Sequence, residues 1–312
     1  MPADRLNLTR LETAVLSVVT GQPPGPVAAR LGLSTAELTD AADTFHNAGR
    51  AALQHRADGR WQAYVEFPDW TIAETTAAPH LAPVLDRGGA PWSFIRKHPH
   101  WRLRLHSGDA DHHELAAALD ALAASGHIRR WHPGIYEPET AAFGGRHAMG
   151  AIHELFHTDS RSILTLPPTP ALGRRELSML LCTCLLRGAG LEWYEQGDVW
   201  QRATTDRPLP KDATAPQVQT LTASIRELLT ADLHPTGTLF GPGCPAEHAS
   251  AWANAFRITG RTLGAASRDG TLNRGLRQVL AYIVIFHWNR LGLAGRTQSL
   301  LAHAARTAIL GP

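Results

Sequence analysis

The sequence has few cysteines and no apolar run long enough to cross a membrane. Its three cysteines, Cys182, Cys184 and Cys244, form neither a CxxC pair nor an even set, which is typical of a reducing compartment rather than of a disulfide scaffold. The longest apolar run, around Ile283 to Phe286, is too short for a spanning helix, and no signal-peptide pattern stands at the N-terminus. We therefore expect a cytoplasmic protein with no membrane partner.

The chain also has no large excess of charge. Its formal net charge is +2, with 17 histidines, and this balance is too mild to indicate nucleic-acid binding by itself. The 312 residues are 44% hydrophobic, which is enough for one large core or for a large domain with a smaller one. Composition alone predicts a globular protein and excludes little else.

The first 60 residues predict a small winged-helix-like module that precedes a larger domain, residues 61–312. Apolar spacing predicts helices over 11–19, over 27–31 and from Ser34 onward, where Ser34 and Glu37 form a capping box. A hairpin is expected over 51–67.

A winged helix that reads DNA places its third helix in the major groove. Here that helix carries Glu37, Asp40 and Asp43 and no lysine or arginine before Arg50. Because phosphate contacts provide much of the affinity for DNA, this helix argues against it. We expect the module to bind a peptide, along the open edge of the 51–67 hairpin or in the groove beside the third helix, or else only to support the sheet.

The rest of the chain alternates helix and strand, which predicts an α+β fold with a mixed or antiparallel sheet and flanking helices. The last predicted helix is apolar on nearly every side and should be buried. Polar segments at 200–216 and 233–245 are candidate mobile lids. Besides a strand at 127–132, the pattern predicts helices over 69–85 (broken at Pro79 or Pro83), 109–125, 146–156, 177–186, 216–229, 246–258 and 276–291.

Residues 92–105 alternate apolar and cationic side chains with the period of two that a strand uses. We expect two strands joined by a proline turn. Arg102 and Arg104 then share one face, opposite three large apolar residues, and Arg96 or Lys97 should come near the same face. Such a face suits an anion or a carbonyl group. The alternative is a solvated surface paired with carboxylates.

Residues 153–157 match the HExxH pattern of helical zinc sites, in which the glutamate acts as general base. A third ligand is required, and none can be picked out downstream. We expect the match to be a coincidence, with His153 on an exposed helix face, His157 at a helix end, and no metal bound.

Five motifs follow one another in the chain between about Trp61 and the C-terminus. They are Phe94–Lys97, Trp101–Arg104, Tyr136–Glu139 with Phe143–Gly145, Phe156–Ser160, and His287–Leu291. In their order and spacing they resemble the C-terminal elimination domain of class I lantibiotic dehydratases and the stand-alone thiopeptide-type bacteriocin biosynthesis proteins.

The resemblance implies a ribosomally made precursor peptide with a leader as partner, possible contacts with other thiopeptide biosynthetic enzymes, and no cofactor. Dehydratase members eliminate glutamate from glutamylated serine or threonine to leave dehydroalanine. A second branch, the thiopeptide pyridine synthases, joins two dehydroalanines in a formal [4+2] aza-cycloaddition.

Two departures favour the pyridine synthase branch. Elimination domains typically carry an arginine before the aromatic-Gly-Gly motif, where this chain has Ala142, and a histidine two residues before His287, where it has Ile285. Elimination needs a base and cations for the departing glutamate, and neither residue supplies them. The alternatives are the glutamate-elimination subunit of a split tRNA-dependent dehydratase and a non-catalytic peptide-binding scaffold.

A cycloaddition needs two alkenes held together and hydrogen bonds that favour the imidic-acid form of one amide. Some candidate residues must be structural, and Asp159 with Arg290 would make a buried ion pair. The candidate catalytic residues that the resemblance implies are Arg96, Arg102, Arg104, Tyr136, Glu137, Asp159, Ser160, Tyr282, His287 and Asn289.

Overall fold

The computed structural model describes residues 8–57, 60–87, 89–106, 109–167 and 171–311. The chain divides into two compact units, residues 1–60 and 61–312. Within the described ranges, no helix is long and apolar enough to cross a membrane.

The first unit is a three-helix cluster. Ser34 and Glu37 form the predicted capping box, in which each backbone nitrogen donates to the other residue's side chain, at 2.9 and 3.2 Å. The hydrogen bonds that the Glu37 carboxylate accepts from the Ser34 backbone and from the Ser34 hydroxyl hold the pKa of Glu37 below its usual range. Buried residues of all three helices, among them Val15, Val27 and Leu38, form a small core. The helices are α1 (Leu8–Val19), α2 (Pro24–Leu31) and α3 (Thr35–Ala57).

The predicted hairpin of the winged helix is wrong. Residues 51–57 continue α3, since Ala51-Ala-Leu-Gln-His-Arg-Ala57 holds good helix formers and no β-branched residue. The turn residues 58–59 lie outside the described ranges. Strand β1 (Arg60–Glu66) pairs with β4 and has a second neighbour, β3. It therefore has no open edge for an added peptide.

The second unit contains a four-stranded sheet, in which the two pairs β1–β4 and β2–β3 are antiparallel. The strand order is β2-β3-β1-β4. Pro133 lies in β4, at the end of this order, where a missing amide donor is tolerated. The remaining strands are β2 (Trp92–Lys97), β3 (His100–His106) and β4 (Arg130–Ile135).

The register separates the cations of β2 and β3. Lys97 pairs with His100, so it shares a face with Arg102 and Arg104, as predicted for one of the two cations. Arg96 pairs with Trp101 and therefore lies on the opposite face. Arg96 therefore lies on the apolar side of the sheet, and not on the predicted face with Arg102 and Arg104.

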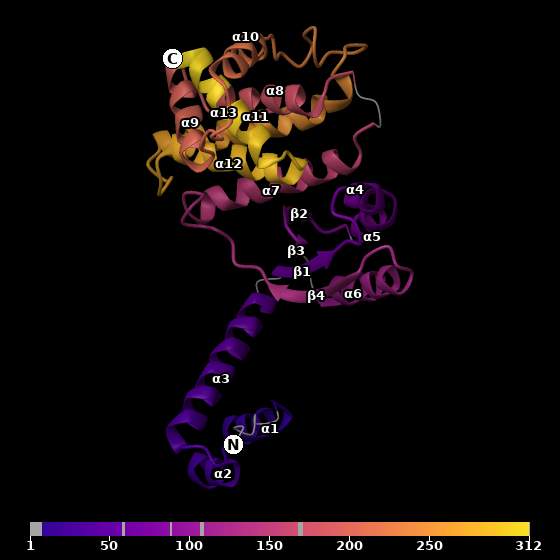
Figure 1. Ribbon diagram of the computed structural model, residues 1–312, viewed down its shortest axis with the longest axis vertical. Helices are drawn as coiled ribbons and strands as arrows, with labels where there is room; N and C mark the ends of the chain where they lie inside the picture. The colour runs from indigo at the N-terminus through magenta and orange to yellow at the C-terminus, as the bar shows by residue number, and fades with distance from the viewer. Residues whose placement is uncertain (1–7, 58–59, 88, 107–108, 168–170, 312) are drawn as a thin grey trace. The chain divides into compact units, whose positions relative to one another are not determined.

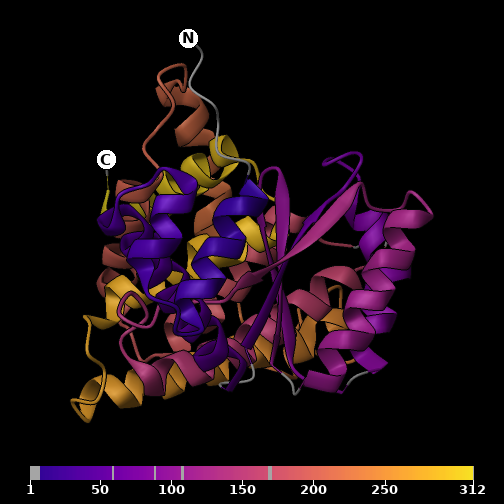
Figure 2. The same ribbon diagram turned by 90° about the horizontal axis from the view of Figure 1, so that it is seen from below.

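That apolar side packs on short helices (Figure 2). Buried residues of these helices, such as Leu81 and Leu119, share one core with Val65 and Leu103 of the sheet. The predicted break at Pro79 appears as a π-helical turn, Ala77–Leu81. The helices are α4 (Ala73–Thr76), α5 (Ala82–Arg87) and α6 (Asp109–Ala124).

A bundle of long helices completes this unit, and α7 is the helix of the bundle that lies nearest the sheet (Figure 1). Helix α12 has the predicted bounds and is buried on most sides. Sequence patterns did not predict α9 or α13, and α9 occupies part of the expected 200–216 loop. The bundle comprises α7 (Arg146–Leu164), α8 (Arg174–Gly188), α9 (Trp193–Asp206), α10 (Ala215–Thr230), α11 (Ser250–Arg268), α12 (Leu276–Leu291) and α13 (Gly295–Leu310).

Side chains of α7 and α12 satisfy the outer edge of β2. Ser160 Oγ accepts a hydrogen bond from the Phe94 amide at 3.0 Å, and Arg290 Nε donates to the Phe94 carbonyl at 2.8 Å. His157 Nδ1 lies 2.8 Å from the carbonyl oxygen of Trp92. Polar backbone groups that would otherwise be buried without partners are thereby paired, and the sheet is fixed to the bundle.

Candidate active site

A buried tyrosine and a buried arginine meet where the loop after β4 crosses the sheet. The Arg104 guanidinium carbon lies 4.2 Å from the centre of the Tyr136 ring, and both residues are almost fully buried. Arg104 Nε donates to Gln62 Oε1 at 3.2 Å. The Tyr136 hydroxyl lies 2.7 Å from His153 Nε2 of α7. A phenol hydrogen-bonded to an imidazole and next to a cation is a set of groups that can transfer a proton and stabilise negative charge.

Glu139 rather than Glu137 contributes a carboxylate to this cluster. Glu139 Oε1 lies 3.6 Å from Arg104 Nη2, whereas the predicted residue Glu137 is exposed. The second oxygen of Glu139 is buried and, among the described residues, has no hydrogen-bond partner. The two glutamates flank Pro138, and the sequence alone did not indicate which of them turns inward.

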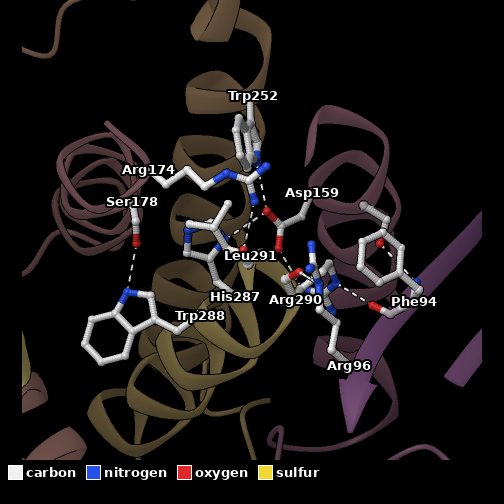
Figure 3. A network of polar contacts seen from close by, with 11 residues as sticks. Phe94, Arg96, Asp159, Arg174, Ser178, Trp252, His287, Trp288, Arg290 and Leu291 are labelled. Carbon is white, nitrogen blue, oxygen red and sulfur yellow. Dashed lines mark hydrogen bonds and ion pairs between the residues drawn. The ribbon is translucent and has the colours of Figure 1, made fainter. Parts of the chain in front are cut away.

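Asp159 is the centre of a second, fully buried network (Figure 3). Its carboxylate accepts hydrogen bonds from Arg290 Nη1 at 2.6 Å and from Trp252 Nε1 at 2.9 Å, and His287 Nδ1 lies 2.9 Å from it. Burial raises the pKa of Asp159, but His287 and Arg290 outweigh that effect and hold the pKa below its usual range.

The contacts of this network join several elements of the fold. Asp159 and Arg290 form the buried ion pair that the sequence suggested, and Ser160 caps the edge of β2. Helix α7 continues to Leu164 through the segment that was expected to leave the helix after Phe156. Tertiary contacts of Asp159 and Ser160 override the modest helix propensity of the segment.

Arg96 is also held by structural contacts. Its Nη2 lies 2.8 Å from Glu74 Oε2 and its Nε donates to the Arg290 carbonyl at 2.8 Å. Arg174 binds the same glutamate and the carbonyl of Leu291. Burial would raise the pKa of Glu74, but Arg174 and Arg96 outweigh it and lower that pKa. The two guanidinium groups therefore bind carbonyls at the C-terminal end of α12.

The remaining candidates are Arg102, Tyr282 and Asn289. Arg102 lies with its guanidinium 5.3 Å from the centre of the Tyr64 ring. Tyr282 is half-buried and its hydroxyl accepts a hydrogen bond from Arg274 at 3.2 Å. Asn289 lies on the wall of a cavity near Arg96.

Both histidines of the HExxH segment face the sheet rather than solvent. His153 contacts Tyr136 and His157 contacts Trp92, while Glu154 is exposed. His157 lies within α7, so its placement at a helix end was wrong, as was an exposed His153. Among the residues that the structure describes, no group of three or more His, Cys, Asp or Glu is placed to hold a metal ion.

Sequence reasoning missed several polar residues at these sites. Gln62 and Glu139 contact Arg104, and Trp252 donates to Asp159. The signal for Gln62 was available, because it alternates with Trp61 and Ala63 in a strand. His153 had been noted only as part of a zinc pattern.

The fold of this chain is similar to the folds of several solved structures, of which two are described here. One is the tRNA-dependent lantibiotic dehydratase MibB from Microbispora sp. 107891, with a TM-score of 0.58 and 19% identity. The match covers 81% of this chain and 28% of that chain, so the chain spans less than a third of MibB. The other is TbtD, the pyridine synthase from thiomuracin biosynthesis, with a TM-score of 0.54 and 14% identity, covering 80% of this chain and 97% of that one.

The family described as lantibiotic biosynthesis dehydratase C-term matches residues 63–309. The chain therefore belongs to that family, as its five motifs predicted. A comparison with curated proteins gives no match. The α+β expectation is confirmed by these solved folds.

Proposed function

We propose that this protein is a thiopeptide pyridine synthase that acts on a leader-bearing precursor peptide with two dehydroalanines. Membership of a family named for lantibiotic biosynthesis supports a role in making a modified peptide, and the fold similarity to TbtD covers nearly all of that protein. The pyridine-forming reaction is our inference from the residues of this chain.

The Tyr136–His153 pair beside Arg104 carries this proposal. To become a diene partner, one amide must lose its N–H proton and gain a proton on oxygen. A phenol and an imidazole 2.7 Å apart can relay that proton, and Arg104 can stabilise charge that develops on the oxygen. Two carbon–carbon bonds then close the ring, one from each end of the azadiene to the second alkene. Loss of water and of the leader as a carboxamide leaves an aromatic pyridine without an oxidant.

Charge pairing argues against glutamate elimination. Arg96 is paired with Glu74 and Arg104 faces Glu139, so these cations are already partly neutralised before an anionic leaving group could bind. Ile285 is buried and apolar and Ala142 is small, at the two positions where the resemblance expects cations or a base. Elimination remains the competing reaction, because Arg102 and Arg104 share one face of β3.

A direct test is mass spectrometry of a bis-dehydroalanine, azole-bearing peptide after incubation with the full chain. A macrocycle with released leader amide is expected. If a glutamylated peptide instead loses glutamic acid to give dehydroalanine, the competing reaction is correct. Tight leader binding without any mass change on either substrate would favour a non-catalytic scaffold.

We also propose that the first unit contributes to leader binding. It contains a groove of about 440 Å³ whose walls combine apolar residues, such as Val27 and Leu31, with polar and cationic ones, such as Arg10 and Arg30. Such a mixed surface suits an amphipathic leader helix. Asp40 and Asp43 of α3 are exposed and would repel phosphate. Fluorescence anisotropy should show tighter binding of labelled leader than of duplex DNA, and weaker leader binding after deletion of residues 1–55. Unchanged leader affinity or stronger duplex binding would contradict this role.

A further inference from the structure

A cavity of about 520 Å³ lies between the C-terminal end of α12 and the start of α13. Its walls include the polar residues Arg96, Arg207 and Asn289 and the apolar residues Trp70 and Leu293. It lies apart from the Tyr136 hydroxyl and its partner His153, neither of which lines it.

The cavity has more positive than negative charge. Arg96 and Arg174 share the single carboxylate of Glu74. Arg207 donates to Gln298 at 2.7 Å, to Asn289 at 3.3 Å and to a backbone carbonyl, and within the described ranges no carboxylate lies within ion-pair distance of it. Burial lowers the pKa of Arg207 more than the adjoining Asp206 raises it. The Arg207 guanidinium is therefore half-buried with no ion-pair partner among the described residues, and an anion in the cavity would supply one.

A network of amides presents further donors to this space. Asn289 Oδ1 accepts hydrogen bonds from Gln298 Nε2 at 3.0 Å and from Arg207. Because two donors fix the oxygen, the other end of the amide must be Nδ2, and this nitrogen makes no hydrogen bond to any residue that the structure describes. Gly295 also lines the cavity, at the start of a helix that has no acidic residue in its first turn and no side-chain cap.

We propose that this cavity binds a carboxylate that carries an apolar body. The second N–H groups on the terminal nitrogens of Arg207 and the Nδ2 group of Asn289 can donate to a carboxylate, while Trp70 and Leu293 provide apolar contacts for the attached chain. Two sources share this chemistry: a free N-acylated amino acid and the C-terminal carboxylate of a peptide.

Calorimetric titration of the full chain with N-acetyl-leucine and with its neutral amide tests the charge requirement. The acid is expected to bind at least about tenfold more tightly, as a charge-assisted hydrogen bond implies. Equal binding of acid and amide, no saturable binding of the acid, or tighter binding of inorganic phosphate would each overturn the proposal. A tripeptide ending in leucine that binds more tightly than N-acetyl-leucine identifies the peptide terminus as the source, and equal binding identifies the free carboxylate.

Two variants locate the site. Arg207→Gln should weaken acid binding at least about tenfold, whereas Arg226→Gln, an exposed arginine of α10, should leave it unchanged. Asn289→Asp places a carboxylate beside Arg207 without a change of shape and should abolish binding, and it provides the answer if Arg207→Gln does not fold. Acid binding that survives Asn289→Asp would overturn the assignment. These measurements involve no turnover, so their outcome is independent of the proposed reaction.

Discussion

Replacing Asp159 with asparagine should strongly destabilise the fold. Asp159 is fully buried and accepts hydrogen bonds or an ion pair from Arg290, His287 and Trp252. Asparagine keeps the shape but removes the charge, so the Arg290 guanidinium stays buried without a counter-ion. Breaking a buried pair in this way costs about 3 to 5 kcal/mol, which is a large part of a stability of roughly 5 to 15 kcal/mol.

The assay is urea denaturation followed by tryptophan fluorescence, with Asp212→Asn as matched control. Asp212 also pairs with an arginine, Arg296, at 2.6 Å, but its side chain is 73% exposed. Solvent screens that pair, so its loss should shift the unfolding midpoint little. If Asp159→Asn moves the midpoint no further than Asp212→Asn does, the buried pair does not hold the sheet to the bundle.

We expect three further outcomes, which concern Asp159, Gly292 and the HExxH segment. The pKa of Asp159 is lower in the folded state than the ordinary value of about 3.9. Its contribution to the free energy of unfolding should therefore be complete above that pH and be lost as the pH falls through the folded-state pKa. A stability that rises on acidification would be inconsistent with this. Gly292→Ala should cost about 1 to 2 kcal/mol in thermal unfolding, since its φ is +78° and a Cβ would lie 2.8 Å from Arg96 Nη1; no change would show that this backbone tolerates a side chain. Chelators should leave activity unchanged and purified protein should lack stoichiometric zinc; one equivalent of zinc that is lost on His153→Ala would revive the metal hypothesis.

Sequence periodicity predicted the elements whose apolar residues follow a clear local pattern. The arginine-bearing hairpin and α12 were found because alternation and all-round apolarity are local signals. The extension of α7 through Asp159 and Ser160 was not, since distant donors on α11, α12 and β2 stabilise it. The prediction for residues 51–57 was wrong for the opposite reason, because a turn signal was given more weight than the helix propensity of these residues.

Site prediction followed the same division. The motifs carry several buried polar groups, but the contacts that each group makes depend on tertiary pairing. Arg96 and Asp159 proved to be held in structural ion pairs. Glu139, which was not among the candidates, lies beside Arg104. Period-two alternation places a side chain on a face, and it does not say which neighbour will neutralise it.

The most direct test of the proposed function is the reaction itself, measured by mass spectrometry with Tyr136→Phe and Glu137→Gln beside the unaltered chain. Removing the Tyr136 hydroxyl breaks the relay to His153 and should slow macrocycle and leader-amide formation by about 100-fold or more, while the exposed Glu137 should tolerate the change. Full activity of Tyr136→Phe, or no macrocycle from the unaltered chain, would contradict the account.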